Sequence, residues 1–432
     1  MSTSPPATPP PAPSRSARAR GLLLDIAPLR HDREFRLLYL GQLFSGIGNQ
    51  ATRLALPFQV YVLTGSTLAL GLLAFVQLVP TVIVTLVAGS LADAFDRRRL
   101  LVLTNIGMAV STGMLVLLAV LPSPPIGLLF LGGFLSMAFS SIDQPTRLAA
   151  TPRLVSPERL PAALTLNQLS GQASSIVGPA IAGLLLATVG PAGAYLFDLG
   201  TFVLAFSMLL LMVPIPHVGS KVKPGIDAIR EGLRYAFRKR ILLSMFVIDL
   251  NAMIFGMPTA LFPVLALEVF DAGPAGVGLL AAAPALGGVL ATVFSGWVGS
   301  VRRAGRGVLV VVAIWGVTIA LFGLSAFSFA LALVFLTAAG LADVLSAVFR
   351  STILQLETPD DLRGRLSAIH VMVVRAGPRL GDIEAAAVAS MAGAQFAVVS
   401  GGVLCLLGLV VIARRFPEMA AYERSLTTRE AV

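Results

Sequence analysis

Long apolar runs alternate with short polar gaps along almost the whole chain. Each run has about the length that a helix needs to cross the hydrocarbon core of a bilayer, roughly 20 residues. The pattern therefore predicts an all-α membrane protein with about twelve transmembrane helices. The expected spans are residues 36–63, 68–92, 100–121, 127–149, 162–187, 194–213, 241–266, 275–299, 307–326, 329–353, 366–391 and 395–413.

Positive charge is confined to every second gap between these runs. The cationic gaps are residues 97–99, 153–159, 221–240, 302–306 and 363–365. The intervening gaps, 64–67, 122–126, 188–193, 268–274, 326–328 and 392–394, contain no Lys or Arg. Short loops rich in Lys and Arg stay in the cytoplasm. The alternation thus predicts an even number of spans with both termini cytoplasmic.

The spans divide into two sets of six. Asn49 in the first span is echoed by Asn251 in the seventh, and Gly89 in the second by Gly296 in the eighth. Equivalent residues at an offset of a little over two hundred favour duplication of a six-helix unit. Two such halves facing one another are typical of secondary transporters, with a cavity at the midplane where the halves meet.

Residues outside the spans complete the domain organisation. We expect a disordered cytoplasmic tail over 1–34, where prolines and small polar residues cannot bury enough surface to fold. The two halves should cover 35–214 and 241–416, followed by a cytoplasmic tail over 417–432. The linker, 215–240, has apolar positions spaced as on one helix face from Ile226 to Phe237, which indicates an amphipathic helix on the inner headgroups.

Composition agrees with a membrane protein and excludes several functions. The chain is 56% hydrophobic and 12% charged, whereas soluble domains contain about 25% charged residues. Its net charge of +10 lies in loops and tails beside anionic headgroups, so lipid and not nucleic acid is the expected partner. The single cysteine, Cys405, is expected to be a small buried hydrophobe. Neither metal-ligand spacing nor a nucleophile motif is present, so we predict no enzyme, metal or cofactor.

Two local motifs carry conformational signals. At the inner end of the second span, Gly89 and Asp93 precede Arg97 and Arg98, a spacing at which acid and base can pair across a tight turn. We expect these four residues to form a conformational latch. The fifth span contains Gly178 and Pro179. Proline removes a backbone hydrogen bond and glycine permits a bend, so this pair indicates a hinge within the helix. Ordinary packing of small residues against a neighbouring helix is the alternative explanation for the second motif.

These motifs resemble those of the major facilitator superfamily. The latch is similar to the pattern G-x-x-x-D-[RK]-x-G-[RK]-[RK] between its second and third spans, although Ala94 and Asp96 depart from it and Ser300 replaces the acid in the second half. The hinge is similar to an exporter-associated G-P-x-x-G-G pattern. The tracts 151–160 and 356–365 resemble the branch that contains the enterobactin exporter and macrolide exporters. The resemblance implies proton-driven efflux of a small molecule across the bacterial cytoplasmic membrane.

Charged residues inside the spans mark the expected pathway, because an ionised side chain at the centre of a membrane helix costs about 2.5 to 3.5 kcal/mol. Asp249 has no basic residue near it on its own helix, so it is our first candidate for a protonatable carboxylate. Asp143 and Arg147 are four residues apart and should pair. Asp198, near the outer end of its span, is expected to have water access and a structural role, and His370 to be a satisfied polar residue. The full candidate set for proton coupling or substrate binding is Asp249, Arg53, Asp143, Arg147, Asp343, Arg350, Arg375, Arg379, Asp382 and Glu384.

Three functions compete for this architecture. A secondary active transporter, exporting a siderophore or drug-like molecule by alternating access in exchange for protons, explains the intramembrane charges. The alternative is a transporter-like membrane sensor or scaffold without transport. A subunit of an ATP-driven pump is disfavoured, because none of Lys221, Lys223 and Lys239 follows a glycine as in a phosphate-binding loop.

Overall fold

The structure is a computed structural model that describes residues 25–94, 96–214, 226–359 and 362–423, apart from the side chains of 85–94, 226–230, 232, 299 and 364. Most of the tails and the first part of the linker predicted from the sequence lie outside these residues. Regular structure in the described ranges is helical throughout. The all-α prediction is therefore confirmed for them.

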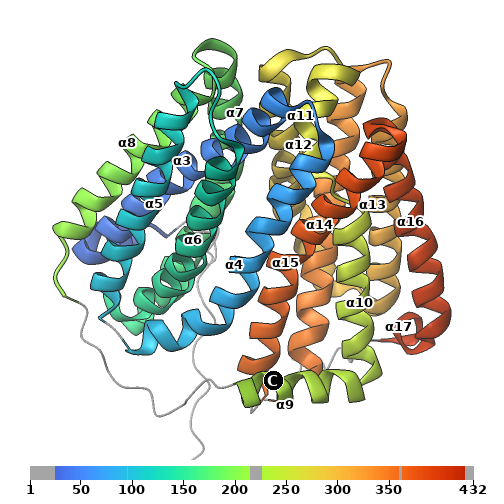
Figure 1. The fold of residues 1–432 in the computed structure, drawn as a ribbon. Helices are drawn as coiled ribbons and strands as arrows, with labels where there is room; N and C mark the ends of the chain where they lie inside the picture. The colour runs from blue at the N-terminus through green and yellow to red at the C-terminus, as the bar shows by residue number, and fades with distance from the viewer. Residues whose placement is uncertain (1–24, 95, 215–225, 360–361, 424–432) are drawn as a thin grey trace, which may run out of the picture.

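The first six long helices form one bundle, which we call the N half (Figure 1). Its central helix, α3, packs against both α7 and α8, while α5 packs against α6 and α8. The helices are α3 (Arg33–Thr64), α4 (Thr67–Ala94), α5 (Arg97–Ala119), α6 (Ile126–Leu154), α7 (Leu160–Thr188) and α8 (Pro191–Leu210).

The remaining long helices form a second bundle, the C half. In it α14 packs against α12 and α13, and α16 against α13 and α15. The elements are α10 (Arg240–Phe255), η2 (Thr259–Leu261), α11 (Phe262–Val264), η3 (Leu265–Val269), α12 (Gly273–Phe294), η4 (Ser295–Ser300), α13 (Ala304–Leu324), α14 (Phe329–Glu357), α15 (Arg363–Ala392) and α16 (Ala394–Arg415).

Four short elements lie outside the two bundles. They are α2 (Ala27–His31), η1 (Pro157–Arg159), α9 (Ile226–Arg238) and α17 (Pro417–Ala421). Helix α9 occupies the linker position and runs across the lower end of the C half (Figure 1). It is joined to α15 by an ion pair of 2.7 Å between Glu231 and Arg365.

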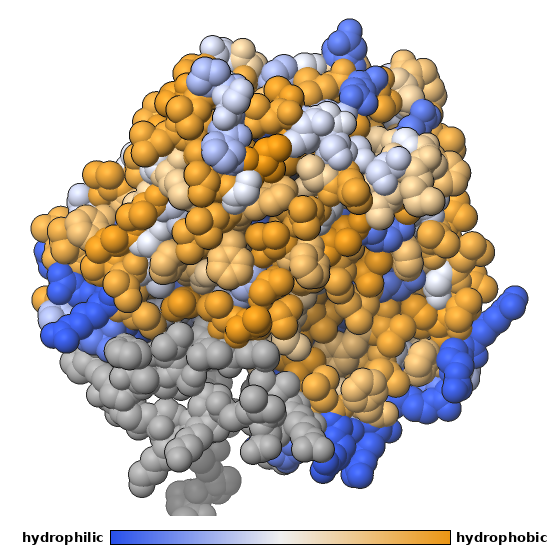
Figure 2. All heavy atoms as spheres, viewed as in Figure 1, coloured by the Kyte–Doolittle hydropathy of each residue, from blue (hydrophilic) through white to orange (hydrophobic). Residues whose placement is uncertain are grey.

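The long helices are suited to lipid. Ten segments of the described chain are long and apolar enough to span a membrane. The two other long helices, α3 with 32 residues and α15 with 30, have the required length but carry intramembrane charges. Apolar side chains such as Leu117 and Val293 are about 70% exposed on the outside of the bundles. Figure 2 shows a mostly apolar surface with hydrophilic residues near its lower edges and at its top. The predicted twelve-helix membrane fold is confirmed.

The two ends of the bundle differ in charge. We call the end that carries residues 97–99, 153–159 and 363–365 the basic end. The opposite end, where the loops 65–66, 189–190 and 393 lie, has no Lys or Arg in these loops, and we call it the arginine-free end. Figure 1 shows the helices of the two halves converging at the arginine-free end and separating toward the basic end.

Close packing of small residues joins the halves at the arginine-free end. Helix α7 packs against α12, and α4 against α15. A Cβ added to Gly278 of α12 would lie 2.6 Å from the Cα of Gly183 in α7, so neither backbone could approach as closely with a larger residue. On the other side of the interface, Gly71 of α4 lies against Ala386 of α15. The structure is therefore closed at this end.

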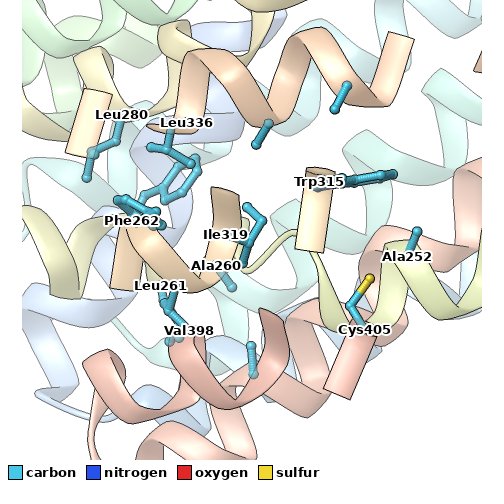
Figure 3. Packing of buried hydrophobic residues seen from close by; sticks show 14 of the residues in the cluster. Ala252, Ala260, Leu261, Phe262, Leu280, Trp315, Ile319, Leu336, Val398 and Cys405 are labelled. Atoms are coloured by element: carbon cyan, nitrogen blue, oxygen red, sulfur yellow. The ribbon is translucent and has the colours of Figure 1, made fainter. Parts of the chain in front are cut away.

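The seventh span departs from the predicted continuous run. Its helix α10 stops at Phe255 and the chain resumes as η2, α11 and the π-helical η3. Non-helical backbone at membrane depth is tolerated only where protein satisfies its polar groups. Here the Trp315 Nε1 donates to the Gly256 carbonyl at 3.0 Å. Figure 3 shows the apolar packing around the break, where Leu261 and Phe262 meet side chains of neighbouring helices.

Candidate functional site

A polar cavity of about 240 Å³ lies in the N half, on the side of α3, α6 and α7. Most of its lining side chains are amides, hydroxyls or charged groups, and few are apolar. They are Gln42, Ser45, Gly46, Asn49, Gln50, Arg53, Met108, Ser140, Asp143, Gln144, Arg147, Ser170, Gly171, Ser174, Ser175 and Phe202. Such a surface can bind a polar or charged small molecule inside a membrane protein.

Asp143 and Arg147 form an ion pair on one wall of this cavity. The Arg147 Nε lies 2.5 Å from the Asp143 Oδ2, as their spacing on α6 predicts. Thr104 of α5 donates a second hydrogen bond to Asp143 at 3.1 Å. The two terminal nitrogens of Arg147 are buried without a hydrogen-bond partner in the described structure. This guanidinium therefore has donor capacity available to a ligand.

Three arginines come together between the halves. Arg53 of α3 lines the cavity and its side chain is exposed to solvent there, although it lies deep within its helix. It is within electrostatic range of Arg375 and Arg379, which α15 contributes from the C half. Arg375 also donates a hydrogen bond across the interface to Gln144, a cavity residue of α6. Like charges at close range repel, so this cluster favours a bound anion.

The C half holds a buried charge network of its own. Arg350 of α14 lies 2.7 Å from the Asp249 Oδ1 and 3.9 Å from the Asp343 Oδ1. The His370 Nδ1 of α15 lies 3.5 Å from the Asp249 Oδ2. The inference that Asp249 stands away from cations is therefore wrong. Its own helix carries no basic residue near it, but two neighbouring helices bring Arg350 and His370 to it. The carboxylate of Asp249 is 1% exposed and that of Asp343 is 31% exposed, so water reaches Asp343 more easily.

Asp382 and Glu384, two residues apart on α15, have different surroundings. The Asp382 Oδ1 accepts hydrogen bonds from the Thr259 hydroxyl and the Ala260 N–H, both at 2.8 Å. Its Oδ2 lies 3.5 Å from Arg379. Asp382 thus fixes the start of η2 after the break in the seventh span. Glu384 is half-buried and takes part in none of the hydrogen bonds or ion pairs found among the described residues.

The predicted latch is partly described. Arg98 donates to the carbonyls of Leu209 and Leu210 at 2.9 and 2.7 Å, and so caps the C-terminus of α8. Arg97 donates to the Ala149 carbonyl of α6 at 2.9 Å. Gly89 lies in the backbone of α4, and the side chain of Asp93 falls outside the described residues. A pairing between Asp93 and the arginines stays a prediction.

The predicted hinge lies at a helix contact. Gly178 and Pro179 are buried in α7, which continues as a helix through both residues. A Cβ at Gly178 would lie 2.5 Å from the Cβ of Gln50 in α3. The motif therefore packs α7 against α3 in this conformation, and bending at this point stays a prediction.

Sequence reasoning missed two features. One is a contact between the halves at the arginine-free end, where the Tyr61 hydroxyl of α3 donates to Glu268 of η3. The other is Asp198 of α8: the expectation of water access is wrong, because the residue is 0% exposed between α3 and α5. The sequence contains the polar residues that contact it, Thr52 and Thr112. The pattern along a single helix does not show that these side chains point toward Asp198.

Comparison with known proteins identifies the family. The family model described as "Transmembrane secretion effector" matches residues 24–430. The chain is 28% identical over 411 residues to the enterobactin exporter EntS of Escherichia coli (strain SMS-3-5 / SECEC), covering 92% of this chain and 98% of that protein. This membrane transporter is thus homologous to an exporter of a small molecule.

Solved structures support the same fold. A POT family transporter in complex with 5-aminolevulinic acid superposes with a TM-score of 0.73 at 12% identity, covering 92% of this chain and 98% of the other. A bacterial homologue of the iron transporter ferroportin in an inward-facing state gives a TM-score of 0.65 at 20% identity, with coverage of 90% and 99%. These likenesses concern the fold alone. The match of the family model to residues 24–430 shows that the chain belongs to the transmembrane secretion effector family, within the major facilitator superfamily.

Proposed function

We propose that this protein is a proton-driven exporter of an anionic or catechol-bearing small molecule of the siderophore class. The carrying observation is the convergence of Arg53, Arg375 and Arg379 from both halves beside a polar cavity. Arg379 has Asp382 as a partner at 3.5 Å, whereas Arg53 and Arg375 form no ion pair among the described residues. Cations without a counter-ion are costly in a membrane interior, so this site favours an anionic ligand. The homology to the enterobactin exporter supports the same cargo class.

The conformation fits the step of alternating access in which cargo enters from the cytoplasm and protons are released there. If the basic end faces the cytoplasm, as the distribution of Lys and Arg favours, the halves are joined on the outer side. Gly183 against Gly278 and the Tyr61 to Glu268 hydrogen bond then form the outer closure. At the basic end, the ion pairs Asp32 with Arg159 and Lys239 with Glu357 each stay within one half. Such an arrangement leaves the arginine cluster available to cargo from the cytoplasm.

Charge neutralisation links the cargo to the protons. Asp343 and Asp249 share Arg350, so protonation of one carboxyl would free the guanidinium to interact more strongly with the other. Asp343 is the more accessible of the two and is the better entry point for a proton. Cargo bound at Arg53 and a proton bound at this network would each stabilise a different conformation, one open to the cytoplasm and the other open to the outside. Exchange of cargo for protons requires this difference.

Transport by purified protein tests the proposal. Proteoliposomes with an acidic lumen should accumulate a labelled catechol siderophore, and a protonophore should abolish the accumulation. Arg53→Gln and Arg379→Gln should each raise the KM at least tenfold, because a charge-assisted hydrogen bond contributes about 1.5 to 3 kcal/mol. Arg414→Gln removes the same charge from an exposed position at the end of α16 and serves as the matched control.

Three outcomes would contradict the proposal. Accumulation that does not depend on the proton gradient would exclude coupling to protons. Equal effects of Arg414→Gln and Arg53→Gln would exclude recognition by the arginine cluster. Transport of a neutral macrolide without transport of the catechol probe would assign the cavity to drug-like cargo instead.

A further inference from the structure

Asp198 is a buried carboxyl that the transport mechanism above does not use. It lies in α8 of the N half and is 0% exposed. Its Oδ2 accepts hydrogen bonds from the Thr52 hydroxyl of α3 at 2.5 Å and from the Thr112 hydroxyl of α5 at 3.3 Å. The Oδ1 is buried without a hydrogen-bond partner among the described residues. Three helices of the N half therefore meet at one carboxyl group.

The groups around Asp198 are neutral. On α3 they are Thr52 and Gly48, whose backbone lies so close that an added Cβ would be 2.7 Å from the Oδ1. On α5 the facing group is Thr112, and on α8 the next titratable side chain is Tyr195, which donates to Gln59 at 2.9 Å. No ion pair of Asp198 occurs among the described residues. The nearest charged residue along α3, Arg53, faces the cavities.

Such surroundings stabilise the neutral form of a carboxyl group. Burial of an ionised carboxylate without a cation is costly, and the group takes up a proton instead. A protonated Asp198 keeps both hydrogen bonds that it accepts and gains a hydrogen on the oxygen that lacks a partner. The Thr201 hydroxyl, which also lies against Gly48, donates to the Asp198 carbonyl at 2.7 Å and retains lone pairs that can accept this hydrogen.

A polar route connects this carboxyl with the cavity. Thr52 also lines a second, smaller cavity of about 20 Å³, together with Gln77 and Ser136. About 10 to 15 Å³ is enough for one water molecule where polar partners are present. The small cavity and the larger one share Asn49, Arg53 and Ser140. A proton can thus pass from the larger cavity to a water molecule beside Thr52, which protonates the Thr52 hydroxyl as that hydroxyl gives its own proton to the Asp198 Oδ2. Rotation of the carboxyl group about its Cβ–Cγ bond then turns the protonated oxygen toward Thr201 and returns an acceptor oxygen to Thr52.

We propose that Asp198 is an exchangeable proton-binding site of the N half, occupied by a proton in this conformation and connected to the cavity through Thr52. Its role in coupling rests on the proposed proton-driven export, but its protonation does not. Loss of the proton would place an uncompensated charge between α3, α5 and α8. Because α3 also carries Arg53, the site would link the proton directly to the helix that contacts the cargo.

Infrared spectroscopy of the full-length protein in lipid nanodiscs tests the protonation. At neutral pH, where exposed carboxyls are ionised, the difference spectrum of wild type minus Asp198→Asn should contain the carbonyl stretch of a protonated carboxylic acid, since other buried acids contribute equally to both proteins. Glu158→Gln, which removes an exposed carboxyl in η1, should leave this band unchanged. Thr52→Val retains the acid but removes a hydrogen bond, so it should shift the band to higher frequency and slow its exchange in D₂O.

The possible results separate the proposal from the export function. A difference spectrum of wild type minus Asp198→Asn without this band, or a band that Thr52→Val neither shifts nor slows, would overturn the site even if export is proton-driven. These spectra need no cargo, so they remain decisive if proteoliposomes show no gradient-driven transport. For coupling, wild type should release protons to a pH-sensitive dye when the catechol probe binds, and release of equal size by Asp198→Asn would overturn that role. Should Asp198→Asn fail to fold, the Thr52→Val spectrum alone decides.

Discussion

The first long helices of the two halves differ in structure, although the sequence predicts equivalent places for them. In the N half, α3 is one continuous helix of 32 residues with Pro57 inside it. In the C half, the matching segment breaks after Phe255, just before Pro258. The broken backbone is stabilised by Trp315 and Asp382, whereas α3 needs no such support. Part of the continuous helix α3, including Gln50 and Arg53, lines the cavity.

The buried charges follow the same division. Arg147 and Arg350 each have two guanidinium nitrogens that are buried without a hydrogen-bond partner among the described residues. In the N half, the ion pair of Asp143 with Arg147 borders a cavity of about 240 Å³. In the C half, Arg350 and Asp249 are 3% and 1% exposed and contact each other away from that cavity. The comparison teaches that two six-helix bundles in one chain can place their polar residues in different surroundings. In the N half they line a cavity, where we expect them to meet a ligand, and in the C half they connect neighbouring helices.

The strongest test of this division compares the two buried arginines. Arg350→Met should lower the free energy of unfolding by about 3 to 5 kcal/mol, since it leaves Asp249 buried without its cation. Arg147→Met should cost less, about 1.5 to 3 kcal/mol, because Thr104 still donates to Asp143 and water in the cavity can solvate it. Thermal unfolding in detergent, followed by size-exclusion chromatography of the soluble fraction, measures the difference.

A double substitution provides the control for this prediction. Asp249→Leu combined with Arg350→Met removes both charges, and it should recover most of the stability that Arg350→Met loses. The two tryptophans, Trp297 and Trp315, both lie in the C half, so intrinsic fluorescence reports its unfolding separately. Equal destabilisation by Arg147→Met and Arg350→Met would contradict the division between the halves.

The second test concerns the broken helix. Asp382→Ala should remove the acceptor of both Thr259 and Ala260 and leave a buried N–H unpaired, at a cost of about 1 to 3 kcal/mol. Asp382→Asn retains a carbonyl acceptor and should restore most of the loss. Hydrogen exchange measured by mass spectrometry should be faster across residues 256–264 in the alanine variant. If α3 shows the same increase, the effect is global and the assignment of Asp382 to the break is wrong.

The sequence predicts the helices well because lipid imposes one strict requirement on every span. Apolar runs located the twelve long helices, and the spacing of Asp143 and Arg147 was sufficient to predict their pairing. Both predictions, the spans and the ion pair, depend only on the positions of residues along a single helix. The break before Pro258 was not predicted, since Pro57, Pro179 and other prolines lie inside continuous helices. Whether a proline interrupts a helix depends on partners such as Trp315 and Asp382, which come from elsewhere in the chain.

Contacts between helices account for the other differences. The partners of Asp249 are contributed by α14 and α15, and the burial of Asp198 depends on the rotation of α3 and α5 about their axes. Hydrophobic periodicity in a membrane helix is weak, because lipid and protein interior are both apolar. The sequence therefore located these acids within their spans, but it did not show which of them would meet a cation.

The smallest expected change in stability concerns Asn49 and Asn251, which the sequence places at matching positions in the two halves. Asn251 of α10 donates to the Cys405 carbonyl of α16 at 2.9 Å, in a space that Gly408 leaves open. Asn49 of α3 lines both cavities. Asn251→Ala should cost about 0.6 kcal/mol, the average of hydrogen bonds between membrane helices, and at most about 1.7. Asn49→Ala should change stability by less than about 0.5 kcal/mol, since water can replace its amide.

Both variants can be compared in the same thermal unfolding assay, with cargo binding as a second readout. Asn49→Ala should weaken binding of the catechol probe while leaving the unfolding temperature almost unchanged, and Asn251→Ala should do the reverse. Asn251→Asp is a useful matched variant, because a carboxylate of the same size cannot donate to the Cys405 carbonyl and should destabilise the C half further. If Asn49→Ala were the more destabilising substitution, α3 would be held by its polar residues just as α10 is, and the N half would lose its distinct role in contacting the cargo.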